Sequence, residues 1–374
     1  MKKLARKICS FLLLPLLAVS VFAQSSASEI IENSLRAIGG RKEIAKIQSL
    51  QAVADCTGPN GNYTTEIYSA RNGRLIFKQV SANGNIYLGQ TNGPTFWTKD
   101  EKSGEFSLAD NRSAAAWRGH DFQFLAMEVA TRFRDFIYAG EENFASRSAL
   151  KLNATDELGN PASVFFDKET RLLRGFTVQN PFDQTETIRI VFNEWKQIGK
   201  LKLPSRVTAT DRKGDFVLNF RAIGLNKTDE KIFAVPAKVV AMNELFELHK
   251  QGRVAHFTRD AKMLVSGFAD DFTSISNGKI SKPSREASFK RFQNYLNNST
   301  FIEWDDITPP VIKVSDDATL AYVLVHKKVR LLAKDESGKE AEETEIFAWA
   351  ALYRKIKGEW KLTAVVSTNT PEKD

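Results

Sequence analysis

The chain has 374 residues, of which 42% are hydrophobic and 10% aromatic, so it can bury two domain cores and is not expected to be disordered. Its formal charge of +8 includes four basic residues in the first 23, and without these, 49 basic residues stand among 45 acidic ones. A net charge of +4 without a basic tract disfavours nucleic acid as a partner.

The first 23 residues predict a secretory signal peptide. A basic start is followed by an apolar run from Ile8 to Ala23, which ends in Val-Phe-Ala, a sequence suited to signal peptidase. A retained membrane anchor is the alternative, but Pro15 and two serines interrupt the run. We therefore expect a periplasmic or secreted protein with no membrane span after cleavage. Cys56 is then its only cysteine, and it is expected to be packed.

The mature chain is expected to start with a short helix from Ser28 to Ile38, which ends at a glycine pair. From Leu50, short strand-like runs such as NYTTEIYSA and RLIFKQV alternate with Gly, Asn and Asp clusters, which is typical of an antiparallel meander. Apolar residues then recur every three or four positions between Gly119 and Phe136, which predicts an apolar helix on one sheet face. Strands resume to about Leu225, with a hairpin turn at Asp167–Thr170.

Several segments of this region resemble the outer-membrane lipoprotein carrier (LolA-like) superfamily over about residues 28–236. They are the AIGG helix end, KIQSL, FFDKETRLLRGF, FNEWKQIGKLKLPSRVTA and FAVP. The resemblance implies a strongly curved antiparallel half-barrel whose concave apolar face is covered by helices and accepts acyl chains. Candidate ligand contacts there are Trp97, Phe122 and Phe133. Aromatic strand residues can equally fill a solid core, and the sequence leaves both possibilities open.

A second domain is predicted to follow a boundary near Pro236. Its expected order is two helices, a strand FTSISNGKI, a helix from Ser284 to Asn297, and four strands. FADDF, SDDATLAYVLV, FAWAALYRKIKGEWKL and VVSTN in this order resemble the nuclear transport factor 2-like superfamily, in its SnoaL-like branch, over residues 240–369. The predicted fold class is therefore α+β: a half-barrel at residues 24–236, then a cone of helices on a bent sheet at 240–370.

The known chemistry of this cone can be compared with the sequence residue by residue. Ketosteroid isomerases use an Asp base, a Tyr and a protonated carboxylic acid in an apolar pocket. The resemblance places the base at Ser276 and the tyrosine on or beside Gly252, and the strand Ile346–Tyr353 has no carboxylate. Isomerase chemistry with these groups is therefore disfavoured.

The stretch from Met242 to Phe272 places several polar residues on an apolar helical stripe. Asp260 is interpreted as a helix cap, and Asp270 and Asp271 as turn residues. His256 remains a pocket candidate, although a histidine that bonds within the core is an equal alternative. The other candidates for the cone pocket are Phe246, Trp304, Tyr322, His326 and Trp349. No catalytic residue, metal site or cofactor is predicted, since the few histidines lack ligand spacing.

These observations predict an exported, non-catalytic binding protein. We expect a hydrophobic small molecule or lipid in the half-barrel, and an accessory cone for small-molecule binding or for homodimerisation through its sheet. The alternative is a small-molecule enzyme, isomerase- or cyclase-like, that acts in the cone with His256 or a carboxylate as acid or base.

Overall fold

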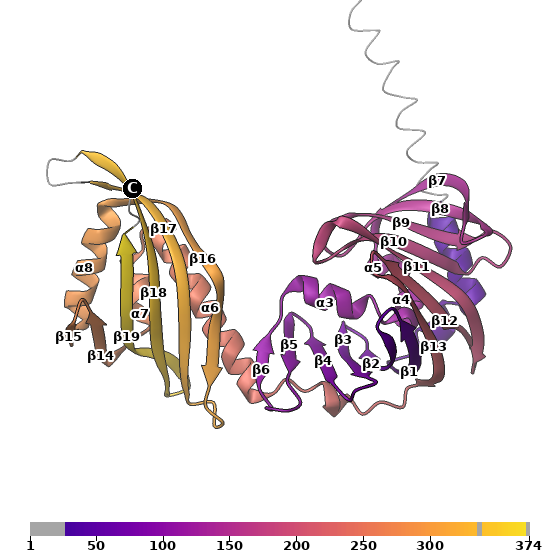
Figure 1. The fold of residues 1–374 in the computed structure, drawn as a ribbon, viewed down its shortest axis with the longest axis horizontal. Helices are drawn as coiled ribbons and strands as arrows, with labels where there is room; N and C mark the ends of the chain where they lie inside the picture. The colour runs from indigo at the N-terminus through magenta and orange to yellow at the C-terminus, as the bar shows by residue number, and fades with distance from the viewer. Residues whose placement is uncertain (1–26, 335–338, 372–374) are drawn as a thin grey trace, which may run out of the picture. The chain divides into compact units, whose positions relative to one another are not determined.

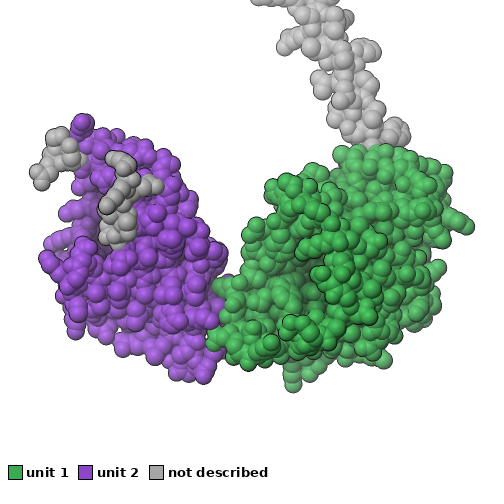
Figure 2. Space-filling model, in the orientation of Figure 1, with its two compact units in different colours: residues 1–234 green, residues 235–374 purple. Residues whose placement is uncertain are grey.

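The computed structural model describes residues 27–334 and 339–371, so the predicted signal peptide lies outside the described residues. The chain forms two compact units that divide between Ala234 and Val235 (Figure 2). Both combine a mainly antiparallel sheet with helices, which is the predicted α+β class. Within the described ranges, no helix has the length and apolarity needed to cross a membrane.

Unit 1 contains one open 13-stranded sheet (Figure 1). Its strands are β1 (Ser49–Gly58), β2 (Gly61–Ala70), β3 (Arg74–Ser81), β4 (Ile86–Asn92), β5 (Thr95–Lys99), β6 (Phe106–Leu108), β7 (Arg134–Phe144), β8 (Arg147–Thr155), β9 (Pro161–Asp167), β10 (Leu173–Asn180), β11 (Asp183–Ile198), β12 (Leu201–Asp211) and β13 (Gly214–Leu225). Each strand pairs antiparallel with its sequence neighbour, except that β6 and β7 form the two edges. The sheet is joined in its middle by β1 and β13, where Leu50 faces Leu225.

The connection from β6 to β7 leads from one sheet edge to the other. It carries α3 (Asn111–Arg118), α4 (Phe122–Met127) and α5 (Val129–Arg132), and Figure 1 shows these helices over the strands of the curved sheet. The sequence predicts one helix from Gly119 to Phe136, and this is wrong in two respects. The helix breaks at Glu128, whose backbone leaves the helical region at φ −126° and ψ 31°, and Phe136 already belongs to β7.

The core of unit 1 lies between these helices and the sheet. Side chains alternate along β1, so that Leu50, Ala52, Ala54 and Cys56 are buried on the same face. Burial raises the pKa of the Cys56 thiol to about 11, as expected for a packed cysteine. A helix over residues 27–38, α2 (Arg41–Ile44) and the 3-10 helix η1 (Glu230–Phe233) complete the unit.

Unit 2 contains a six-stranded sheet with three helices. The helices are α6 (Ala237–Phe257), α7 (Ala261–Ser266) and α8 (Arg285–Asn297), and the strands are β14 (Phe268–Ser276), β15 (Lys279–Ser281), β16 (Ser299–Val314), β17 (Leu320–Lys334), β18 (Glu340–Ile356) and β19 (Glu359–Pro371). The strand order is β15-β14-β19-β18-β17-β16, and β14 pairs parallel with β19.

Asp260 has its predicted role as a helix cap, whereas Asp270 and Asp271 lie in a strand and not in the predicted turn. Asp260 caps α7, because its side chain accepts a hydrogen bond from the Met263 amide at 2.8 Å. Asp270 and Asp271 are exposed and form ion pairs with arginines at 3.2 Å. They lie at the start of β14, which begins at Phe268, four residues before the predicted strand.

Candidate functional site

A cavity of about 390 Å³ lies within unit 2. It is bounded by α6, α7 and α8 and by five of the six strands, from β14 and from β16 to β19. Aromatic side chains line it from several of these elements, among them Phe268, Phe272, Phe292, Trp304, Trp349 and Trp360. Its volume and largely apolar wall match those of sites that bind small molecules.

Small residues on α6 leave this space open. Gly252 and Ala255 both line the cavity, and a β-carbon at Gly252 would approach the Trp304 indole to 3.5 Å. The Phe268 and Phe272 rings, which also line the cavity, stack at 4.2 Å between centroids. The wall thus combines flat aromatic rings with two short residues of α6.

His256 lines the cavity and stacks on Trp304, with ring centroids 4.3 Å apart. Its Nδ1 atom lies 2.6 Å from the Gly252 carbonyl oxygen. Burial, with a contribution from the charge of Lys327, lowers the pKa of His256 to about 4, although the Gly252 carbonyl opposes this shift. The imidazole is therefore neutral at neutral pH, and its ring packs like an aromatic residue.

An ionic cluster around the buried Lys327 supports the Trp304 side of the cavity. The Lys327 ammonium is only 1% exposed; it pairs with Asp306 at 2.7 Å and lies 3.8 Å from the Trp304 ring centroid. His249 contacts the other Asp306 oxygen through Nε2 at 2.8 Å. Burial opposes ionisation of Asp306, but the bonds from His249 and Lys327 outweigh it and lower its pKa. The carboxylate thus has two partners within the protein.

The two positions that the isomerase resemblance singles out both face this cavity. Ser276 and Gly252 line it, in place of the catalytic aspartate and tyrosine of ketosteroid isomerases. Neither residue can remove a proton from a carbon acid or protonate an enolate. Tyr353 also lines the cavity, and burial raises the pKa of its hydroxyl to about 12, so it is a protonated hydrogen-bond donor there.

The structure brings together three of the residues predicted for the cone pocket: His256, Trp304 and Trp349 all line the cavity. Tyr322 and His326 do not, because they alternate with Val323 and Val325 on β17 and lie on the exposed face of the sheet. Phe246 is also absent from the wall; its half-buried ring on α6 lies 5.2 Å from the Lys250 ammonium.

Other residues of the cavity were not singled out from the sequence. His249 faces it about two helical turns before His256, and α8 contributes Arg291, Phe292 and Tyr295. Lys327 contacts Trp304 without lining the cavity, and the sequence could have indicated its position, since it lies among the valines of β17 and must point inward with them. The α8 residues had no such signal, because the helix is mostly polar.

The concave face of unit 1 is filled in this structure. Phe122 on α4 is 1% exposed and meets Phe192 and Phe220 edge to face, at 5.9 and 6.3 Å between centroids. The other two residues predicted here are also buried: Trp97 on β5 is fully buried, and Phe133 is 4% exposed. Phe133 borders a hollow of about 70 Å³, which is too small for an acyl chain, and it also lines a more open hollow of about 530 Å³ beside Ala27 and Ile31.

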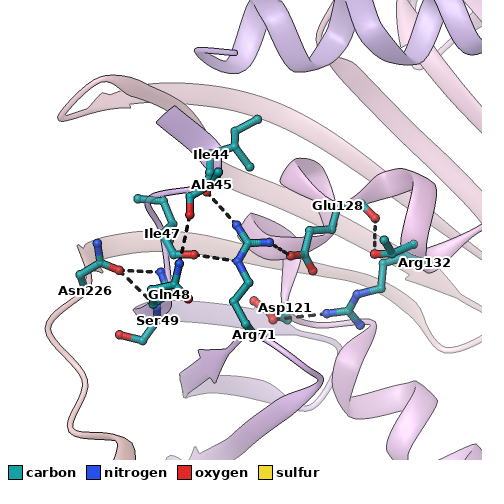
Figure 3. Close-up of polar contacts among 11 residues, drawn as sticks. Ile44, Ala45, Ile47, Gln48, Ser49, Arg71, Asp121, Glu128, Arg132 and Asn226 are labelled. Carbon is teal, nitrogen blue, oxygen red and sulfur yellow. Dashed lines mark hydrogen bonds and ion pairs between the residues drawn. The ribbon is translucent and has the colours of Figure 1, made fainter. Parts of the chain in front are cut away.

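Two ion pairs fasten the α4–α5 segment to the rest of unit 1 (Figure 3). Arg71, in the turn after β2, pairs with Glu128 and also donates hydrogen bonds to the carbonyls of Ile44 and Ile47, at 2.8 and 2.9 Å. Arg132 pairs with Asp121 at 3.5 Å. Burial raises the pKa of Asp121 to about 6, although Arg132 and Ser69 oppose this. The polar contacts of this segment therefore depend on a few side chains.

The chain matches no protein-family model and no curated protein sequence. Among solved structures, a LolA superfamily protein from Nitrosomonas europaea is 13% identical over 56% of this chain and 97% of that protein, with a TM-score of 0.41. A DUF1329 family protein from Desulfovibrio piger is 14% identical over the same shares, also at 0.41. An NTF2-like protein from Rhodospirillum rubrum is 18% identical over 33% of this chain and 96% of that protein, at 0.27.

The structural neighbours of the chain thus include LolA superfamily proteins over its N-terminal part and NTF2-like proteins over a smaller part. These are the two families that its sequence resembles.

Proposed function

We propose that the chain is an exported, non-catalytic binding protein for small hydrophobic molecules. The observation that carries this proposal is the open cavity of unit 2, which is about 390 Å³ in volume and has a largely apolar wall with aromatic side chains from several elements. Of the titratable groups on its wall, His256 is neutral and bonded to the Gly252 carbonyl, and His249 is bonded to Asp306. Export is supported by the signal-like sequence of residues 1–23.

We also propose a second ligand site in unit 1, where a lipid or acyl chain would take the place of the α4 side chains in the half-barrel. The support for this site is local: α4 has only six residues, yet it fills the concave face with side chains such as Phe124 and Met127. If the segment moved away, a large aromatic surface would be available to hydrocarbon.

The alternative of an enzyme in the cone is less favoured by the geometry. A base with a pKa of about 4 removes protons weakly at neutral pH, and the His256 Nδ1 atom is already engaged by the Gly252 carbonyl. We therefore expect the His256→Gln variant to change ligand affinity and not to abolish a turnover step.

The cavity proposal is tested with two neighbouring valines on β19. Val365 lines the cavity, whereas Val366 is 39% exposed and does not line it. Val365→Phe should fill the space and weaken the uptake of an apolar fluorescent probe at least about tenfold. Val366→Phe adds the same bulk outside the cavity, so it should bind like the unmodified chain. Equal binding by both variants would contradict a site in unit 2.

The unit 1 site is tested through the contacts that hold α4 and α5. Arg71→Gln removes the pair with Glu128, and it should speed the uptake of a fluorescent fatty acid in chains that also carry Val365→Phe. Arg74→Gln is the matched control, because Arg74 pairs instead with Glu230. Native mass spectrometry and organic extraction of the same chains would identify any copurified lipid. Chains that repeatedly emerge empty and take up no fatty acid would rule out this site.

We further infer that two copies pair through the sheet of unit 2. The support is an exposed apolar face, on which Tyr322 and Leu324 of β17 lie beside Leu352 of β18 and Val311 of β16. Leu324→Glu should convert the dimer to a monomer in sedimentation velocity. A strictly monomeric unmodified chain at about 100 μM would exclude this pairing, since stable interfaces persist at such concentrations.

A further inference from the structure

The wall of the unit 2 cavity has an uneven distribution of charge. Among the described residues that line it, none is aspartate or glutamate, and one, Arg291 on α8, is arginine. Neither histidine of the wall offers a second cation to a ligand, because His256 is neutral and His249 is bonded to Asp306. Glu343 and Glu345 belong to a neighbouring hollow beyond Tyr295. The cavity therefore combines an apolar interior with a single guanidinium.

The partners of the other cations on α8 differ from those of Arg291. The guanidinium of Arg285 donates to the carbonyls of Val265 and Phe268 and also pairs with Asp270. Lys290 pairs with Glu286 at 2.8 Å. For Arg291, by contrast, the described part of the chain provides no ion pair and no hydrogen bond to the side chain. An arginine left in this state next to an apolar cavity has its donors available for a ligand.

The orientation of Arg291 is nevertheless restricted. Its guanidinium carbon lies 4.9 Å from the ring centroid of Phe292, which is itself part of the cavity wall. Stacking on an aromatic ring leaves the edge of the guanidinium free, and this edge matches a carboxylate with two parallel hydrogen bonds. Three serine hydroxyls of the wall, Ser274, Ser276 and Ser367, offer further donors to an oxygen-bearing group.

We propose that the ligand of unit 2 is an amphipathic carboxylate, whose hydrocarbon or aromatic part occupies the cavity and whose acid group pairs with Arg291. This inference rests on the proposed function, because it names the class of molecule that the same cavity takes. A carboxylate meets no like charge from the residues that line the cavity, whereas an amine would meet the guanidinium. A neutral molecule of the same shape would gain no ion pair and would leave the exposed guanidinium to water.

The test uses pairs of probes that differ only in the acid group: naphthaleneacetate and naphthaleneacetamide, and octanoate and octanamide. Each is titrated by calorimetry into the full mature chain at pH 7 and low salt. We expect each carboxylate to bind at least about tenfold more tightly than its amide. Arg291→Gln should reduce this ratio to below about twofold while the affinity for the amides is kept. Arg291→Lys should retain an intermediate ratio, because lysine keeps the charge but not the paired donors.

Lys290→Gln is the matched control, since it removes a neighbouring positive charge that does not line the cavity. It should leave the ratio unchanged, and circular dichroism should show that all three variants keep their helices. Equal binding of carboxylates and amides by the unmodified chain would overturn the inference and leave the proposed hydrophobic site standing. If no probe binds, and Val365→Phe is indistinguishable from the unmodified chain, the proposed function of the cavity fails with it.

Discussion

Both units place helices on one face of a mainly antiparallel sheet and carry many aromatic residues there, yet α4 fills the concave face of unit 1, whereas the helices of unit 2 leave a cavity. The difference lies in the residues that the helices present. In unit 1, α4 presents large side chains such as Phe122, Phe124 and Met127, all of them buried. In unit 2, α6 presents Gly252 and Ala255 at the cavity, beside larger side chains such as Leu248 and His256. Whether a site is open thus depends on the size of the covering side chains more than on the aromatic content of the strands.

The largest expected effect is that of a truncation in the interior of unit 1, which tests how closely the side chains under α4 are packed. Phe122→Ala removes a ring that two other phenylalanines contact, so the free energy of unfolding of unit 1 should fall by about 3–5 kcal/mol. Phe182→Ala is the control, since Phe182 is 60% exposed and its loss should cost about 0.5 kcal/mol or less. Hydrogen exchange of peptides from each unit would separate the two responses. A loss below about 1 kcal/mol for Phe122→Ala would mean that this face is not tightly packed.

The second prediction concerns the response of unit 2 to acid. His256 has a pKa of about 4 when folded, below its usual 6.5, so the unfolded chain takes up the proton first as the pH falls. Unit 2 should keep its full stability above about pH 6.5 and lose about 3 kcal/mol by pH 4. His256→Gln should remove most of this loss. His326→Gln, on the exposed face of β17, should retain it. Unfolding curves across this pH range that are the same for both variants would contradict the burial of a neutral His256.

Unit 1 should respond to the same acidification with the opposite sign. The pKa of Asp121 is raised from 3.8 to about 6, so the folded chain binds the proton more tightly than the unfolded chain does. The contribution of this carboxyl to the stability of unit 1 should therefore rise by about 3 kcal/mol as the pH falls from above 6 to below 4. Asp121→Asn should lose this gain when stability is followed by hydrogen exchange. If the variant keeps the gain, another group is responsible for it.

The smallest expected effect is the change in unfolding free energy when a valine is enlarged to phenylalanine in each of the two interiors. Val164 is fully buried in unit 1, and Val164→Phe should destabilise that unit by about 1–3 kcal/mol, because a packed core must distort to accept the ring. Val365→Phe in unit 2 should cost less than about 1 kcal/mol, since its ring can enter the cavity. Denaturant unfolding of both variants measures the difference. A larger loss for Val365→Phe would contradict an open cavity.

The sheets and most element boundaries could be predicted from the sequence because alternation and turn residues are local signals. The hairpin at Asp167 shows this, since its carboxylate accepts hydrogen bonds from the amides of Glu169 and Thr170. Helix α3 was missed because its eight residues, NRSAAAWR, carry little apolar periodicity, although Asp110 caps it. The break at Glu128 was missed because the apolar spacing continues across it.

The candidate site could be predicted only in part. The helical spacing of α6 indicates His256, and strand positions indicate Trp304 and Trp349. The sequence does not say that Phe246 lies outside the wall, or that Arg291 lies at it without an ionic partner. Those facts depend on how α6 and α8 rotate against the sheet, which is decided by packing volumes between residues far apart in the chain. The open space itself depends on the same volumes.

The pairing of β1 with β13 has a consequence for how unit 1 folds. The strands β1 to β6 and β7 to β13 are two meanders, each built from contacts between sequence neighbours, and they can form early. The two meanders join only when β1 pairs with β13, for example where Leu50 faces Leu225. Of the strand pairs in this sheet, this central pair has the longest sequence separation. Until β1 and β13 pair, each meander has an unpaired inner edge, which is open to pairing with another chain. The order of folding, more than the final packing, thus determines when this chain is most prone to aggregation.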